Sequence, residues 1–321
     1  MIRPKHDHCS ISTSAGIKCI QNAPYLSISK STTGCVRIDE VDEERLVEIL
    51  GWQQRRGVNG LFVCGTTGEG VSMTTIERME VAQICVKHAP EVPVVVHVGT
   101  NAMKDVRALA AHADEIGASA IAAAPPSFFR PSHAEALYCA AEAAAAAETL
   151  PFYYYHIPSM TGVELDMEQF VADAIDRIPN FVGVKFTHNN LGEFERCVER
   201  FGDQAQMLFG RDELLLDSLK AGGVGAVGST YNYAAPLYQK LIAAHRSGND
   251  EEACEWQKRA CAFIDVLIEY RGCAATKMFM QVCGLNSGNN RLPLPAFDQA
   301  GVDAMKAKLD QMGFFQWVES K

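Results

Sequence analysis

Short apolar runs alternate with longer amphipathic stretches from about residue 40 onward. Each run is short enough for one buried strand and ends in Gly, Pro, Ser or Thr, which favour turns. This pattern predicts strands at residues 60–64, 93–99, 118–124, 151–156, 181–187, 205–209 and 225–229. The stretches between them predict helices near residues 74–88, 102–116, 132–148, 166–176, 191–200, 213–221 and 234–246.

Strand and helix together make a repeating unit about thirty residues long. Such a repeat implies a parallel sheet with helices outside it. Seven clear strands at this spacing favour a closed (β/α)8 TIM barrel over an open doubly wound sheet, and no Gly-x-Gly-x-x-Gly follows a first strand. After residue 250 the pattern is purely helical, with helices near 251–270, 274–284 and 300–313. The predicted fold class is α/β, a TIM barrel with a C-terminal helical extension.

The first strand of this barrel is the weak point of the prediction. Before residue 40 the chain is rich in Ser, Thr, Lys and Cys, and only residues 25–29 alternate like a strand. We therefore divide the chain into an irregular N-terminal segment with a doubtful first strand (1–35), the barrel (36–250) and C-terminal helices packed on the barrel (251–321).

Composition and charge exclude several classes of protein. The chain has 321 residues and a net charge of −10, which argues against a nucleic-acid or anionic-membrane partner. Its eleven cysteines are scattered without a Cys-x-x-Cys pair, which favours reduced thiols, and no apolar run is long enough to span a membrane. The expected location is the cytoplasm. The histidines considered as metal ligands lack a shared i, i+4 face, and none is expected to bind metal: His6, His8, His88, His97, His112 and His133.

Lys185 is a single cation in an otherwise apolar strand, residues 181–187. Desolvation lowers the pKa of a lysine and frees its amine for attack on a carbonyl, so Lys185 is a candidate Schiff-base former. The structural alternative is an ammonium that reaches the strand end or sits in an ion pair.

Three further segments carry polar groups at the ends of predicted strands. The loop Gly65–Gly70 (Gly-Thr-Thr-Gly-Glu-Gly) offers hydroxyls and amides to a carboxylate, or is simply a turn with threonine caps. In residues 151–158, Tyr153 and Tyr155 share a face, and Tyr155 lies nearest the mouth, where a phenol can transfer protons; core packing is the alternative. Asp212 and Glu213 follow the seventh strand and can accept hydrogen bonds from a polyol, although Asp212 can also cap the next helix.

Five motifs occur in order: Gly-Thr-Thr-Gly-Glu, Tyr-x-Ile-Pro with Tyr155, Gly-x-Lys-x-Thr with Lys185, Gly-x-Asp-Glu, and Gly-Ser-Thr-Tyr-Asn. From about residue 36 to its end the chain therefore resembles the pyruvate-dependent class I aldolases typified by N-acetylneuraminate lyase and dihydrodipicolinate synthase. The N-terminus departs from the family, because nothing before Gly34 matches the Thr-Pro turn that normally ends the first strand.

The resemblance implies a reaction and a set of site residues. Lys185 is expected to form the Schiff base and Tyr155 to transfer protons, while Thr66 and Thr67 bind the substrate carboxylate. The sugar tail is expected to contact Thr187, Gly210, Asp212, Glu213 and Ser229. The expected partners are small molecules (sialic acid and pyruvate), with no metal, no cofactor and a homotetrameric assembly.

Two positions favour the sialic-acid branch of the family. Dihydrodipicolinate synthases carry an arginine that holds a second carboxylate at the position of Met160, and a tyrosine pair at Phe128–Phe129. Residues 153–158, 210–213, 228–233 and 291–294 instead resemble N-acetylneuraminate lyases, notably those of animals. The implied reaction is cleavage of N-acetylneuraminate to N-acetylmannosamine and pyruvate. Another aldolase or dehydratase acting on a 2-keto-3-deoxy sugar acid, or a non-catalytic sugar-acid-binding barrel, remains an alternative.

Overall fold

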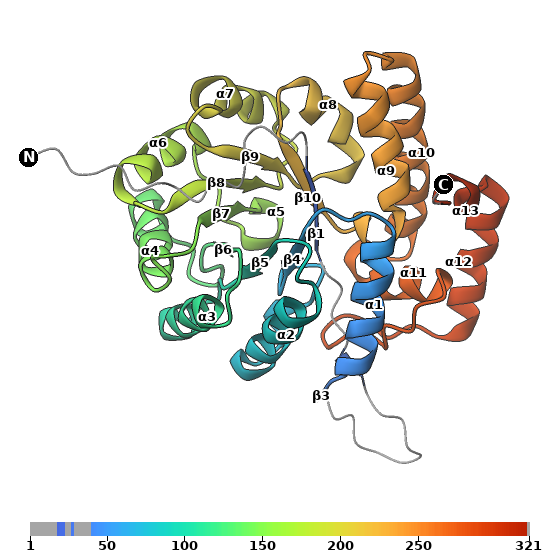
Figure 1. The fold of residues 1–321 in the computed structure, drawn as a ribbon, viewed down its shortest axis with the longest axis horizontal. Helices are drawn as coiled ribbons and strands as arrows, with labels where there is room; N and C mark the ends of the chain where they lie inside the picture. Colours follow the sequence, from blue (N-terminus) through green and yellow to red (C-terminus); the bar gives the residue numbers. More distant parts are fainter. Residues whose placement is uncertain (1–17, 23–26, 29–39, 320–321) are drawn as a thin grey trace, which may run out of the picture.

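The computed structural model describes residues 18–22, 27–28 and 40–319, and eight parallel strands within them close into a barrel (Figure 1). The fold prediction is confirmed. In spatial order the strands are β1 (Lys18–Asn22), β10 (Gly225–Gly228), β9 (Gln206–Phe209), β8 (Phe181–Phe186), β7 (Phe152–His156), β6 (Ala120–Ala123), β5 (Val94–His97) and β4 (Leu61–Val63).

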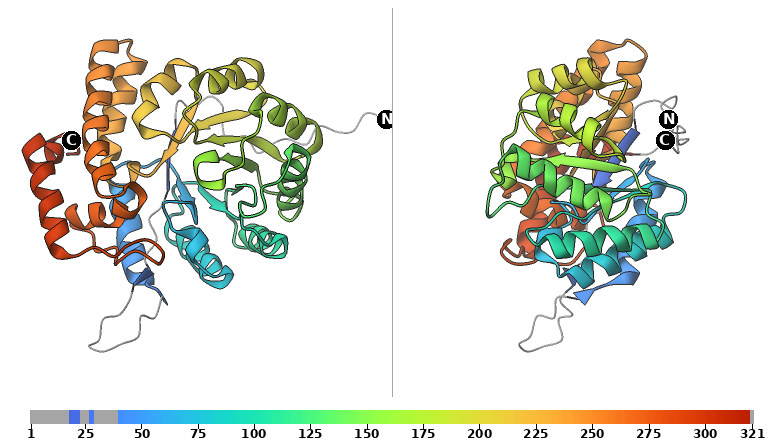
Figure 2. Two further views of the ribbon diagram at one scale, coloured as in Figure 1. Left: turned by 180° about the vertical axis from the view of Figure 1, so that it is seen from behind. Right: turned by 90° about the vertical axis from the view of Figure 1, so that its left-hand side faces the viewer.

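Helices surround the barrel and bury the outward faces of its strands (Figure 2). The longer ones are α1 (Glu43–Arg55), α2 (Thr75–His88), α3 (Met103–Glu115), α4 (His133–Ala145), α6 (Met167–Arg177), α7 (Leu191–Phe201), α8 (Leu215–Lys220) and α9 (Tyr231–Arg246). Three short helices follow strands at the mouth: the 3-10 helices η1 (Gly70–Ser72) and η2 (Asp212–Leu214) and the α-helix α5 (Pro158–Thr161). Strands β4 to β10 are buried on both faces, which explains why their sequences read as continuous apolar runs.

The first barrel strand lies earlier than predicted. β1 pairs with β10, Lys18 opposite Gly225, and with β4, Gln21 opposite Leu61. The predicted strand at 25–29 is therefore not a barrel strand. Its residues Ser27–Ile28 form β2, antiparallel to β3 (Glu40–Val41), and its other residues lie outside the described part of the chain. Alternating apolar and polar residues indicate a strand with one buried face. A barrel strand is instead defined by its pairing with a neighbour on each edge, and β1 shows no alternation that would have indicated it in the sequence.

Helix α1 is an element that the sequence analysis did not predict. Asp42 begins it, because the Asp42 carboxylate accepts the backbone N–H of Arg45 at 3.0 Å. Its buried residues lie at the i, i+3, i+4 and i+7 positions of one helical face: Leu46, Ile49, Leu50 and Gln53. This periodicity was the signal that could have found the helix.

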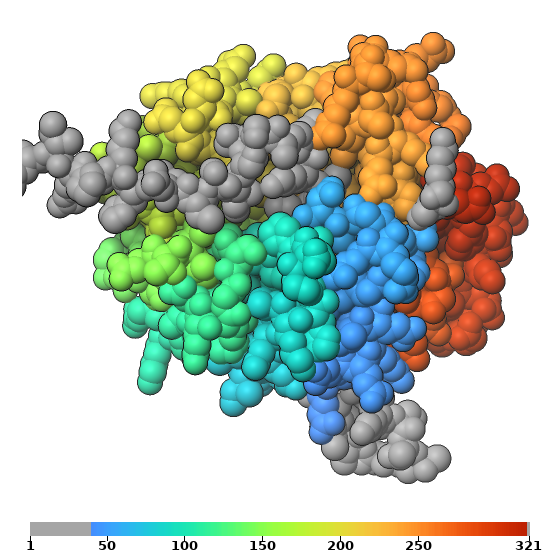
Figure 3. Space-filling view, viewed as in Figure 1, coloured from blue at the N-terminus to red at the C-terminus, as the bar shows by residue number. Residues whose placement is uncertain are grey.

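The C-terminal helices lie beside α1 and α9, at one side of the barrel (Figures 1 and 3). They are α10 (Asp250–Glu269), η3 (Gly272–Ala275), α11 (Thr276–Val282), α12 (Gln299–Met312) and α13 (Phe314–Trp317). Tyr233 of α9 stacks on Phe279 of α11, with ring centroids 4.0 Å apart, and Phe279 in turn contacts Phe314. The extension therefore shares its core with the barrel. None of the described helices is both long and apolar enough to cross a membrane.

Candidate active site

A bulge in β8 decides which way Lys185 points. Phe152 pairs with Phe181, but Tyr153 pairs with Gly183, so β8 contains one extra residue at this point. Side chains alternate along a regular strand, so Phe181 and Lys185 would share a face. The extra residue reverses the alternation, and Phe181 packs outward against the helices while Lys185 faces the barrel interior.

Gly183 makes this bulge sterically feasible. A Cβ at Gly183 would lie 2.1 Å from the carbonyl oxygen of Gln206, far inside van der Waals contact. Backbone atoms cannot give way as a flexible side chain can, so only glycine fits here.

The Lys185 amine is enclosed by aromatic rings. The side chain is 1% exposed, and Nζ lies 3.9 Å from the ring centroids of both Phe62 and Tyr155. Burial lowers the pKa of Lys185 well below its usual value, while the nearby acidic groups of Asp212 and Cys273 oppose that shift. The environment therefore favours a neutral amine, as a nucleophile requires.

Tyr155 lies directly opposite Lys185 in the pairing of β7 with β8. Its hydroxyl is 3.2 Å from Thr66 Oγ1, so the two hydroxyls share a hydrogen bond. Burial raises the pKa of Tyr155 above its usual value, and the hydroxyls of Thr66 and Thr187 partly oppose the shift. The phenol is therefore protonated at rest and connected to the loop that follows β4.

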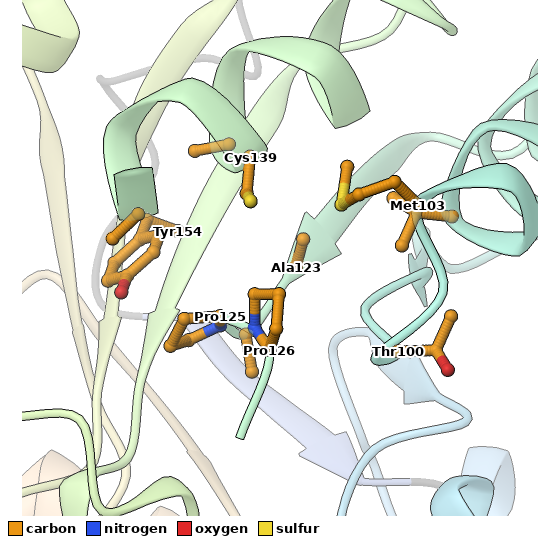
Figure 4. Close-up of a pocket in the computed structure, with 11 residues that line it drawn as sticks. Thr100, Met103, Ala123, Pro125, Pro126, Cys139 and Tyr154 are labelled. Atoms are coloured by element: carbon orange, nitrogen blue, oxygen red, sulfur yellow. The ribbon is translucent and has the colours of Figure 1, made fainter. Parts of the chain in front are cut away.

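The other two tyrosines of β7 have different surroundings. Tyr153 faces the barrel interior, but its hydroxyl donates to Gln206 Oε1 at 2.8 Å. Tyr154 points outward, next to Cys139 and Pro125, at a cavity of about 10 Å³ between β7, α3 and α4 (Figure 4). This cavity has room for about one water molecule and is too small for a substrate.

The loop Gly65–Gly70 forms a tight turn and is anchored by an ion pair to the C-terminal helices. A Cβ at Gly70 would lie 2.1 Å from the carbonyl oxygen of Cys64, so the turn requires glycine. Glu69 adopts a left-handed conformation (φ 54°), and its buried carboxylate forms an ion pair with Lys277 at 2.9 Å. Thr66 and Thr67 are thus carried by a loop that the C-terminal helices hold in place. The sequence analysis missed Glu69 as an anchor, because its partner is far away along the chain.

Asp212 is almost completely buried at the mouth. Its Oδ2 accepts hydrogen bonds from the backbone N–H and the hydroxyl of Thr230, at 2.9 and 2.6 Å, while no described residue contacts its Oδ1 with a hydrogen bond. Burial raises the pKa of Asp212 to about 6, against the Thr230 hydrogen bonds, which lower it. The reading of Asp212 as a cap of its own helix is wrong, since η2 has no side-chain cap and the carboxylate reaches across to the start of α9.

Two glycines at strand ends make room for these polar side chains. A Cβ at Gly210 would lie 1.9 Å from Thr187 Oγ1, and a Cβ at Gly228 would lie 1.5 Å from Asp212 Oδ1. The two glycines therefore leave space for the side chains of Thr187 and Asp212 over the strand ends. The spacing of the sequence motifs does not reveal this role.

The remaining two predicted residues lie at the periphery of this group. The Glu213 carboxylate forms an ion pair with Arg211 at 2.5 Å, in a partly exposed position. Ser229 follows β10 directly, and its carbonyl oxygen accepts a hydrogen bond from the side chain of Asn232 at 2.7 Å. No hydrogen bond or ion pair among the described residues joins Glu213 or Ser229 to Lys185.

A cavity of about 500 Å³ opens at the mouth beside Tyr155 and Thr66. Met160 lines it and is 56% exposed; this is the position at which the resemblance implies an arginine in dihydrodipicolinate synthases. His97 also lines it, and its two ring nitrogens contact the Cys64 carbonyl oxygen at 3.1 Å and the Ala124 N–H at 3.2 Å. Burial lowers the pKa of His97 well below its usual value, which fits a neutral ring that shapes the wall of the cavity.

Fold and site together define a (β/α)8 barrel with a desolvated lysine, a phenol and hydroxyl groups gathered at the carboxyl ends of its strands. Residues 27–312 match the dihydrodipicolinate synthetase family. The chain belongs to this family.

Among its relatives, the N-acetylneuraminate lyase of Mus musculus is 42% identical over 81% of this chain and 83% of its own length. The N-acetylneuraminate lyase of Homo sapiens is 38% identical over 84% and 86% of the two chains. Among solved structures, the N-acetylneuraminate lyase of Proteus mirabilis superposes with a TM-score of 0.87 at 33% identity, covering 94% of this chain and all of the other.

Proposed function

We propose that this protein cleaves N-acetylneuraminate reversibly to N-acetylmannosamine and pyruvate by class I aldolase chemistry. The observation that carries the proposal is the desolvated Lys185 amine, packed against the ring of Tyr155 at the barrel mouth. Relatives that bear the name N-acetylneuraminate lyase, at 38–42% identity over most of the chain, support this substrate.

The neutral amine of Lys185 attacks the C2 ketone, and loss of water gives a protonated imine. This imine accepts the electron pair of the C3–C4 bond as the C4 hydroxyl loses its proton, so that N-acetylmannosamine leaves as an aldehyde. The remaining enamine takes a proton at C3, and water then hydrolyses the imine to release pyruvate and regenerate Lys185. Tyr155 is suited to relay these protons, because it is protonated at rest and shares a hydrogen bond with Thr66.

Local donors have to hold the substrate carboxylate, because the chain as a whole carries a net charge of −10. The Thr66–Thr67 loop presents hydroxyls and backbone amides beside Tyr155, and we assign the carboxylate to it. A second carboxylate finds no cation at Met160, which disfavours the substrate of the synthases.

The hydroxyl tail of the sugar is assigned to the opposite side of the mouth. Asp212 Oδ1 is a buried acceptor without a hydrogen bond from any described residue, so a sugar hydroxyl would satisfy it. Thr187, Gly210, Glu213 and Ser229 complete this half of the proposed site.

The proposed assembly is a homotetramer in the cytoplasm. Phe128 and Phe129 are adjacent, edge to face, and 80% and 84% exposed in the isolated chain. Exposed aromatic pairs are typical of subunit contacts, and light scattering of Phe128→Ser against the wild type would test this one. Seven of the described cysteines form no disulfide, which supports a reducing compartment: Cys85, Cys139, Cys197, Cys254, Cys261, Cys273 and Cys283.

Borohydride reduction in the presence of pyruvate tests the mechanism, because it fixes the imine as a stable adduct. We expect a single adduct on Lys185 by mass spectrometry and none in Lys185→Ala. An adduct that persists in Lys185→Ala would contradict the mechanism. Pyruvate release from N-acetylneuraminate compared with 2-keto-3-deoxygluconate separates the proposed substrate from its closest alternative, and adduct formation without any turnover would identify a binding protein.

A further inference from the structure

Two histidines and a glutamate converge outside the barrel, where β7, β8 and α7 meet. One ring nitrogen each of His156 and His188 and a carboxylate oxygen of Glu193 all lie within 4.8 Å of one another. His156 ends β7, His188 follows β8, and Glu193 lies in the first turn of α7. These positions form no spacing motif in the sequence, so only the fold brings them together.

Neither imidazole nitrogen has a hydrogen-bond partner among the residues that the structure describes. His156 is 2% exposed, and both its Nε2 and the Nδ1 of His188 are buried atoms. Glu193 Oε2 is 4.0 Å from His188 Nδ1, beyond hydrogen-bond length. Buried polar atoms without partners are rare, and two of them facing one carboxylate indicate a place for a cation.

Glu193 itself is already fixed by the backbone. Its Oε1 accepts the N–H of Met167 at 2.9 Å, and its own N–H donates to Asn190 Oδ1 at 3.2 Å. Asn190 Nδ2 donates a long hydrogen bond of 3.4 Å to its Oε2, so the carboxylate is held in position beside the two rings, which limits the entropy lost when a ligand binds.

We propose that His156, His188 and Glu193 bind one divalent transition-metal ion, and that Zn²⁺ fits this donor set best. Two imidazole nitrogens and one carboxylate oxygen are ligands that Zn²⁺ commonly takes, with a fourth position left for water. The ligand atoms have to draw together to reach about 2.0–2.2 Å from the ion. The His188 side chain, 34% exposed, has the freedom to make that movement and leaves a path from solvent.

The ion would stabilise structure and would not take part in the proposed reaction. Successive side chains of a strand point to opposite faces, so His156 lies behind Tyr155 and outside the barrel. The backbone N–H of Thr187 already donates to the His156 carbonyl oxygen at 2.8 Å. A bound ion would add a second link between β7 and the segment that carries Thr187.

The test is metal binding by the full chain, without an affinity tag and after removal of metal with EDTA. A calorimetric titration with ZnCl₂ is expected to show one site per chain. The melting temperature of the protein is expected to rise when Zn²⁺ is bound. CoCl₂ is expected to give the visible absorption of a tetrahedral site. His188→Ala should weaken binding by more than the roughly 10- to 100-fold that the loss of an outer partner costs, and His156→Gln should do the same.

His133→Ala is the matched control for the loss of a histidine. His133 is as exposed as His188, at 32%, but it pairs with the single carboxylate of Asp173. A second control, His6→Ala with His8→Ala, removes the histidines at the start of the chain. Binding that is lost in His188→Ala and kept in both controls supports the site. No binding by the wild type, or binding that His188→Ala leaves unchanged, overturns it.

Discussion

The carboxylate of Glu69 and the ammonium of Lys277 form a buried ion pair, 2.9 Å long, that joins the Thr66–Thr67 loop to the C-terminal helices. Glu69 also accepts the backbone N–H of Arg291 at 2.8 Å, and Lys277 donates to the Asn289 carbonyl oxygen at 3.0 Å. The extension after residue 250 therefore supports the mouth of the barrel directly.

Lys277→Met should destabilise the protein and weaken pyruvate binding. It leaves the Glu69 carboxylate buried and unpaired, which costs about 3–5 kcal/mol, and it releases the loop that is proposed to hold the carboxylate. Urea unfolding and the KM for pyruvate measure the two effects. Lys308→Met is the control, because its exposed pair with Glu269 is screened by solvent and should contribute little to stability. Equal losses in the two variants would contradict the anchoring role of Glu69.

Imine formation at Lys185 should persist at neutral pH. A lysine with an ordinary pKa is almost wholly protonated there, whereas burial lowers the pKa of Lys185 and leaves more neutral amine. The rate of adduct formation, measured with cyanoborohydride across pH 5 to 10, should level off well below the pKa of a free lysine and fall as the pH drops further. A rate that keeps rising to about pH 10 would show an unperturbed amine.

Tyr155→Phe should keep imine formation but lose most turnover. The substitution removes one hydroxyl from a buried ring, and the loss of a positioned proton-transfer group costs about 10²- to 10⁴-fold in kcat. Tyr153→Phe is the matched control, since that hydroxyl faces the same interior but bonds to Gln206. Equal loss of adduct and turnover in Tyr155→Phe would mean that Tyr155 orients Lys185 and does not relay protons.

Gly228→Ala should displace the Asp212 carboxylate and raise the KM for N-acetylneuraminate. The added methyl group would lie 1.5 Å from Asp212 Oδ1, so the carboxylate has to leave its place over β10. Adduct formation with pyruvate should change little, because pyruvate lacks the sugar tail. Gly192→Ala, inside α7 and in ordinary van der Waals contact, should be neutral or stabilise by up to about 1 kcal/mol. An unchanged KM in Gly228→Ala would remove Asp212 from the proposed site.

The contribution of Asp212 to stability should fall as the pH rises through about 6. Its carboxyl binds a proton more tightly in the folded protein, where its pKa is raised to about 6, than in the unfolded chain, where the usual value is 3.8. The stabilisation that this tighter proton binding gives the folded state is therefore lost as the pH rises from 3.8 to about 6. The unfolding free energy of the wild type minus that of Asp212→Asn should therefore be larger at pH 4 than at pH 7. A difference that is constant over this range would show that Asp212 is not desolvated.

Much of the fold could be predicted from local patterns. Strands such as 118–124 and helices such as 102–116 appear in the structure with small shifts of their ends, because a doubly buried strand and an amphipathic helix each leave a direct mark on the sequence. The first strand was misplaced, because β1 is recognised by its pairing with β10 and β4.

The candidate site was only partly predictable. The Lys185 and Tyr155 motifs are local, and they indicated a lysine and a phenol near one rim. The roles of Gly228 and Lys277 depend on contacts with residues distant in the chain, and no spacing rule contains them.

The sequence by itself determined that a lysine would lie in a buried strand, that a tyrosine would end the neighbouring strand, and that the repeating unit would bring both to one mouth. The sequence determines both, because apolar runs mark the buried strands and the order of strands and helices sets the repeat. Only the tertiary structure decided that Lys185 faces inward, because that direction depends on the bulge beside Gly183 and on the close approach of Gln206 from the next strand. It also decided that the Asp212 carboxylate covers Gly228, since that position results from contact between separate elements.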